Sequence, residues 1–143
     1  MELNEYFKEG LGKLDKYLKD LYSELDIFMR QFDKNAKGYD KLAKADKKYR
    51  SVIDGLKSKL EEAVYKSDIG GIAKSSSGLY QILDPKSDRM QMIKNLYANK
   101  NIKKRIKLET FTRGSEIIMK YYISPIQKII ETQKQRKPVK KAA

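Results

Sequence analysis

The feature that most constrains the fold is a heptad repeat near the N-terminus. Apolar residues recur there at alternating spacings of four and three, which is the pattern of a and d positions. Charged residues of both signs lie between them, with Asp15 and Lys19 spaced for an i,i+4 pair. The repeat predicts a long amphipathic helix over about 4–32 whose seam packs within the chain or against a partner subunit. The predicted packing or assembly seam consists of Phe7, Leu11, Leu14, Leu18, Leu21, Leu25, Phe28 and Phe32.

A second stretch of helical periodicity follows between Tyr39 and Val64. Gly38 marks a break before it, so the second helix either folds back as a hairpin or continues the first helix with a kink. The short polar connection favours the hairpin, because each apolar seam must be buried against another element.

Residues 67–78 are rich in Gly and Ser and lose this periodicity, so a linker is expected over 67–84. They predict a mobile linker between packing helices in 1–66 and a basic helical region in 85–133, followed by a basic tail in 134–143. The run from Gly70 to Ser75 is superficially similar to a phosphate-binding loop. It has Ala73 where that loop requires Gly before the Lys, and no strand precedes it, so nucleotide hydrolysis is not expected.

In the basic region, Asp84 and Pro85 are typical of a helix start. One uninterrupted helix would place lysines on the same side as Met90, Ile93 and Leu96, so a break near 99–101 is the simpler interpretation. Residues 124–127 form a capping box with Pro at the first position, so either a new helix starts there or a long one kinks. The sequence therefore predicts an all-α protein of four to five helices.

The chain contains no His and no Cys, which removes the commonest general base, the cysteine nucleophile and the thiolate zinc site. Glu61 and Glu62 are adjacent, but neighbours on a helix point about 100° apart and cannot converge on one substrate. No carboxylates have the spacing of a metal-binding loop. We expect no catalytic site, no cofactor and no metal site.

The net charge of +13 is distributed unevenly. Residues 1–85 hold 16 Lys and Arg against 15 Asp and Glu, and their charged faces are interpreted as merely solvated. Residues 86–143 hold 16 against 4, a net of +12, which predicts an anionic partner. The expected nucleic-acid-binding residues are Arg89, Lys94, Lys100, Lys103, Lys104, Arg105, Lys107, Arg113, Lys120, Lys128, Lys134, Arg136, Lys137, Lys140 and Lys141.

The chemistry of the cations predicts binding that does not depend on base sequence. Lys outnumbers Arg by 26 to 6. Arg provides the forked contact that reads guanine, whereas Lys acts as a hydrated point charge on phosphate. Tyr97, Tyr121 and Tyr122 lie in the basic half and could stack on bases, but the favoured interpretation places them in apolar stripes.

The alternative function is a helical-bundle scaffold, or a peripheral protein whose basic side faces anionic lipid. The lysines over 100–107 are backed only by Ile102 and Ile106, which favours nucleic acid, because membrane insertion uses a larger apolar face. The acidic start at 1–5 predicts no secretory signal, and no apolar run is long enough for a membrane span.

In size, charge, helix content and lack of Cys, the chain resembles the small helical coat proteins of filamentous archaeal viruses. Residues 100–107 and the tail are the segments that would contact DNA in this resemblance. It implies a repeated, non-catalytic subunit that coats linear double-stranded DNA, with DNA favoured over RNA, and a place in the virion. Otherwise, a cytoplasmic or nucleoid-associated protein is expected.

Overall fold

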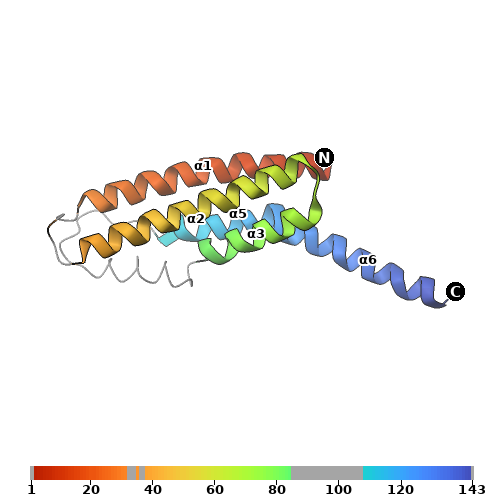
Figure 1. Ribbon diagram of the computed structural model, residues 1–143. Coiled ribbons are helices and arrows are strands. Elements are labelled where there is room, and N and C mark those ends of the chain that lie inside the picture. The colour runs from red at the N-terminus through yellow and green to blue at the C-terminus, as the bar shows by residue number, and fades with distance from the viewer. Residues whose placement is uncertain (1, 32–34, 36–37, 85–107, 143) are drawn as a thin grey trace.

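A computed structural model describes residues 2–31, 35, 38–84 and 108–142 of the chain. All regular secondary structure within these residues is helical, which confirms the all-α prediction. The helices are α1 (Leu3–Arg30), α2 (Tyr39–Tyr65), α3 (Ile69–Leu83), and a continuous run of α5 (Leu108–Ile118), a π-helical turn (Met119–Ile123) and α6 (Ser124–Ala142). Figure 1 shows α1, α2, α3 and α5 packed as a bundle, from one end of which α6 extends.

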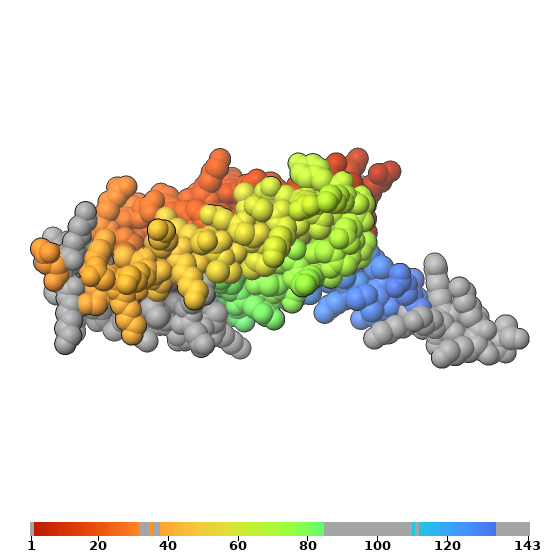
Figure 2. All heavy atoms as spheres, in the orientation of Figure 1, coloured from red at the N-terminus to blue at the C-terminus, as the bar shows by residue number. Residues whose placement is uncertain are grey.

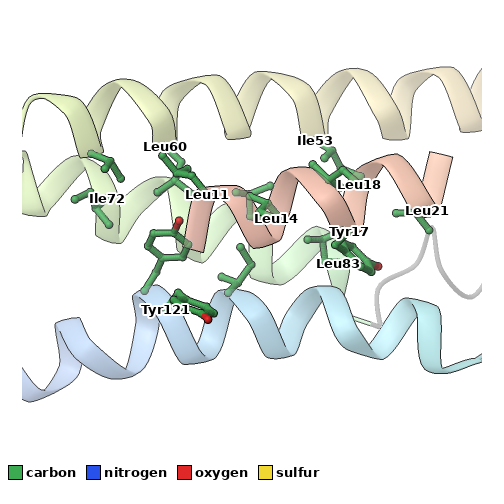
Figure 3. Close-up of a cluster of buried hydrophobic side chains, with 14 of the residues drawn as sticks. Leu11, Leu14, Tyr17, Leu18, Leu21, Ile53, Leu60, Ile72, Leu83 and Tyr121 are labelled. Carbon is green, nitrogen blue, oxygen red and sulfur yellow. The ribbon is translucent and has the colours of Figure 1, made fainter. Parts of the chain in front are cut away.

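The heptad seam of α1 lies inside this bundle. Phe7, Leu11, Leu14, Leu18, Leu21, Leu25 and Phe28 are all buried, while Phe32 lies outside the described residues. Side chains from α2, α3 and the last helical run converge on the seam, as Figure 3 shows for Ile53, Ile72 and Tyr121. The seam thus forms the core of a single chain, and its described residues leave no apolar face free for a partner.

Helices α1 and α2 form the antiparallel hairpin (Figure 1). The N-cap of α2 is Gly38, whose φ of 91° lies in the left-handed region that glycine adopts without steric cost. Across the hairpin, Arg50 contacts Asp26 at 2.8 Å, Lys57 pairs with Asp15, and the Tyr22 hydroxyl donates to Asp54 at 2.8 Å. These polar ties flank the buried seam and help fix the register of the two helices.

The prediction of a linker over 67–84 is wrong, because residues 69–83 form helix α3. Helix α2 ends in a Schellman motif, in which the Asp68 N–H donates to the Ala63 carbonyl at 2.8 Å and Ser67 has a φ of 54°. Asp68 then caps α3, since its carboxylate accepts a hydrogen bond from the Gly71 N–H at 3.1 Å.

Small residues allow α3 to lie close against α2. A Cβ at Gly71 would come within 3.1 Å of the Ala63 Cβ, and one at Gly78 within 3.0 Å of Leu56. Ser75 and Ser76 are buried on the same helix together with its apolar residues. The Gly and Ser content that suggested flexibility therefore serves close helix packing.

The last helical run passes Ser124 without starting anew. Ser124 has helical dihedrals, with φ of −63° and ψ of −46°, so the predicted capping box does not form. The helix instead widens into a π turn just before Pro125, which has no N–H to donate to the Tyr121 carbonyl. Of the two predicted alternatives, the long helix with an irregular turn is the one observed.

Candidate functional site

Three of the predicted nucleic-acid-binding residues have described side chains. Arg113 on α5, Lys120 in the π turn and Lys128 on α6 are all exposed. Lys134, Arg136, Lys137, Lys140 and Lys141 belong to the last turns of α6, where the structure describes the backbone alone. The remaining predicted residues lie outside the described residues: Arg89, Lys94, Lys100, Lys103, Lys104, Arg105 and Lys107.

Helix α5 and the π turn are not themselves basic. Residues 108–133 hold three cations and three acids, so their net charge is zero. The excess of +12 comes from two blocks, with +7 in residues 86–107 and +5 in residues 134–143. Since residues 1–85 carry a net of +1, the helices that build the core are close to neutral. The charge excess of the protein thus belongs to residues 86–107 and 134–143, while the sequences of α1, α2, α3 and α5 are together close to neutral.

The second block lies on a helix that leaves the bundle. Figure 1 shows α6 extending away from the other helices toward the C-terminus. Ile126, in its first turn, is buried, whereas Ile130 is 44% exposed. All five charged residues of this helix beyond Glu131 are cations. A helix without tertiary contacts is marginal in water, so contact with a polyanion would stabilise this part of the chain.

Two of the three tyrosines in the basic half, Tyr121 and Tyr122, belong to the core. Tyr121 is 6% exposed and its ring lies 4.8 Å from that of Tyr6. Tyr122 is fully buried, and its hydroxyl donates to the Phe7 carbonyl at 2.9 Å. Burial raises the pKa of Tyr122, so the hydroxyl keeps its proton and remains a donor. Both residues therefore complete apolar stripes, and only Tyr97 lies outside the described residues.

Five of the 15 acids in residues 1–85 lie where α2 faces α1. Arg50 contacts Asp26 and also Asp46, at 3.2 Å, and Lys57 contacts Asp15 and Glu61. Burial raises the pKa of Asp46, although Arg50 opposes the shift. We call this set, together with Asp54, the ionic seam. It holds two cations against five carboxylates.

A cavity of about 410 Å³ lies between α2 and α3. Three lysines line it, and none of them belongs to the nucleic-acid-binding set that the sequence predicts. Lys66 is paired with Glu62 at 2.6 Å, while no ion pair with described residues is found for Lys59 or Lys74. The complete lining is Leu56, Lys59, Glu62, Ala63, Lys66, Asp68, Gly71, Lys74 and Ser75. The lining holds three lysines against two acids, so its net positive charge suits an anionic group better than an apolar ligand.

A smaller cavity of about 250 Å³ is lined by Tyr80, Ser115, Glu116, Met119 and Lys120. It holds one carboxylate and one ammonium group, and the Ser115 hydroxyl donates to the Thr112 carbonyl at 2.9 Å. Among the described residues, no group of three or more acidic side chains could hold a metal ion. In the same part of the chain, no helix is long and apolar enough to cross a membrane.

Comparison with known proteins gives no family for this chain. No family model, no curated protein and no solved structure matches it. Its function is therefore inferred from the residues and their arrangement.

Proposed function

We propose that the protein is a non-enzymatic structural protein that binds nucleic acid largely independently of sequence. The observation that carries this proposal is the uneven distribution of charge along the chain. The near-neutral helices bury their apolar seam within the chain, and the +12 excess lies in residues 86–107 and 134–143. A single-sign excess of this kind attracts a polyanion and repels itself in the absence of one. Lysine predominates in both blocks, which fits contact with phosphates and not with base edges.

The proposal extends to a repeated subunit that coats DNA, as the resemblance to filamentous viral coat proteins implies. The heptad seam is buried inside the chain, so contacts between subunits would use other surfaces. Exposed apolar side chains occur where α1 begins and where α2 is connected to α3, namely Leu3, Tyr65 and Ile69, and Ile130 is exposed on α6. These are the residues through which we expect copies of the chain to touch along DNA.

Substitution of Lys103, Lys104, Arg105 and Lys107 by Gln tests the first charge block. We expect weaker binding to every duplex sequence and a fall of about 3 to 4 in the slope of log affinity against log salt. The reason is that each phosphate which the protein no longer neutralises lowers this slope by about 0.9. Fluorescence anisotropy with a short labelled duplex measures both quantities.

The matched control removes the same number of charges from α1, by Gln at Lys8, Lys13, Lys16 and Lys19, which are all exposed. We expect this control to bind nearly as the wild type does. If the first variant keeps the wild-type affinity and fold, the assignment of residues 103–107 to nucleic acid is wrong. Stronger wild-type binding to anionic vesicles than to duplex DNA would favour the membrane-surface alternative.

Negative-stain electron microscopy tests the coat-type proposal directly. Purified protein mixed with linear double-stranded DNA should give filaments of uniform diameter, and protein alone should not. Discrete beads on otherwise naked DNA would contradict a repeated coat and leave only non-specific binding. Decorated vesicles in a parallel sample with anionic lipid would again favour the alternative function.

A further inference from the structure

Helix α2 carries a row of exposed lysines that is not evident from the net charge of residues 1–85, which is only +1. At 100° per residue, Lys41, Lys44, Lys48, Lys59 and Lys66 fall within an arc of about 60° on the face of α2 that points away from the core. The arc extends for about 37 Å along the helix, at 1.5 Å per residue. All five side chains are exposed. We call these residues, together with Lys74 of α3, the lysine stripe.

Acidic residues are nearly absent from this face. Glu62 is the carboxylate that falls within the arc, and it is paired with Lys66. Asp40 lies about 40° outside the arc, four residues before Lys44, whereas Asp46, Asp54 and Glu61 belong to the ionic seam. By contrast, the exposed residues of α1 and its N-cap outside the ionic seam mix five cations with four acids: Lys8, Lys13, Lys16, Lys19 and Arg30 with Glu2, Glu5, Glu9 and Asp20. The balanced charge of the N-terminal half thus conceals a strongly cationic side.

The spacing within the stripe makes it self-repulsive. Lys44 lies three residues from Lys41 and four from Lys48, and like charges at these separations destabilise a helix by a few tenths of a kcal/mol per pair. No ion pair with described residues relieves Lys41, Lys44, Lys48, Lys59 or Lys74. A linear polyanion along the helix would remove this repulsion.

The cavity between α2 and α3 marks the end of the stripe nearest the α2–α3 connection. There Lys59, Lys66 and Lys74 come from two helices to line one hollow, with the buried Ser75 beside them. In Figure 2 the surfaces of α2 and α3, yellow and green, adjoin on the face toward the viewer. The lining also contains Asp68, and Glu62, which pairs with Lys66. The ammonium groups of Lys59 and Lys74 are therefore the cations that this hollow offers to a single phosphate.

We infer that the lysine stripe is a second phosphate-backbone contact surface, formed by the half of the chain that is neutral overall. This inference rests on the proposed function and extends it to α2 and α3. Nucleic acid fits better than a membrane surface, because the apolar side of α2 is buried in the core and cannot insert into lipid. The residues between the lysines along the stripe include Ser51 and Gly55, which keep the surface free of bulky side chains.

The test compares two full-length variants with equal charge. One carries Gln at Lys44, Lys48, Lys59 and Lys74, and the other carries Gln at Lys8, Lys13, Lys16 and Lys19 of α1. All eight lysines are exposed, so both variants should keep the wild-type circular dichroism and melting temperature. We expect the salt slope for duplex DNA to fall by about 3 to 4 in the stripe variant, and by less than about 1 in the α1 variant.

Equal reductions of the slope in the two variants would show a general effect of net charge and overturn the inference. A wild-type slope in the stripe variant, combined with a reduced slope in the 103–107 variant, would overturn the inference and leave the proposed function standing. Absence of DNA binding by the wild type at low salt would overturn both. Weaker binding of the stripe variant to phosphatidylserine vesicles, with DNA binding unchanged, would overturn the inference and assign the stripe to lipid.

Discussion

Binding of the full chain to duplex DNA should weaken by about 10³ to 10⁵ when salt rises from about 50 to 200 mM. The magnitude corresponds to release of counterions from about six to ten phosphates. The two basic blocks together contain 13 cations and one acid, which is enough to make that number of contacts. The affinity should be nearly the same for duplexes of different base sequence, because Lys contacts phosphate without reading bases.

Fluorescence anisotropy over a series of salt concentrations, with two unrelated duplex sequences, measures this effect. A neutral-salt series at constant pH isolates the electrostatic contribution, since the chain has no His that would titrate near neutrality. An affinity that stays flat over this range would contradict a phosphate-driven interaction. A strong preference for one sequence would contradict the expectation of non-specific binding.

The long helices could be predicted because their signal repeats over many turns. The expected helix over about 4–32 is observed as Leu3–Arg30, and the second stretch of periodicity is observed as Tyr39–Tyr65. In each helix the apolar positions agree on one buried face over several turns, so local irregularities such as Gly12 do not obscure the pattern.

Helix α3 could not be predicted in the same way because Ser75 and Ser76 interrupt the apolar residues of its buried face. Gly and Ser have low helix propensity. The structure shows that the glycines allow close packing, because Gly71 lies against Ala63 and Gly78 against Leu56. Asp68 did carry a local signal, because Asp is a preferred N-cap and here caps α3. Ser67 carried none, since the left-handed position that ends α2 usually holds Gly or Asn.

The lysine stripe could not be predicted for a related reason. Net charge counted along the chain averages over opposite sides of a helix, and it assigned +1 to residues 1–85. The ionic seam shows that acids such as Asp46 and Glu61 lie toward α1. Lys44 and Lys59 are exposed on a different face of α2. Charge must therefore be counted by face once the buried side of a helix is known.

The close approach of α1 to the π turn makes a pair of glycine substitutions diagnostic for the fold. A Cβ added at Gly10 would lie 2.7 Å from the Tyr121 Cβ and 2.7 Å from the Tyr122 hydroxyl, whereas one at Gly12 would meet nothing within 4 Å. Ala at either position should favour the helix by about 0.5 to 1 kcal/mol. At Gly12 that gain should appear in full as a raised melting temperature.

At Gly10 the steric cost should exceed the gain, so Gly10→Ala should lower the free energy of unfolding. Overpacking costs about 1 to 3 kcal/mol, and neither neighbour can yield easily. The Tyr121 Cβ is fixed to its backbone, and the Tyr122 hydroxyl is held by its hydrogen bond to the Phe7 carbonyl. Chemical denaturation of the two variants measures the difference. If Gly10→Ala were as stable as Gly12→Ala, α1 and the π turn would not be in contact, and the bundle would be assembled differently.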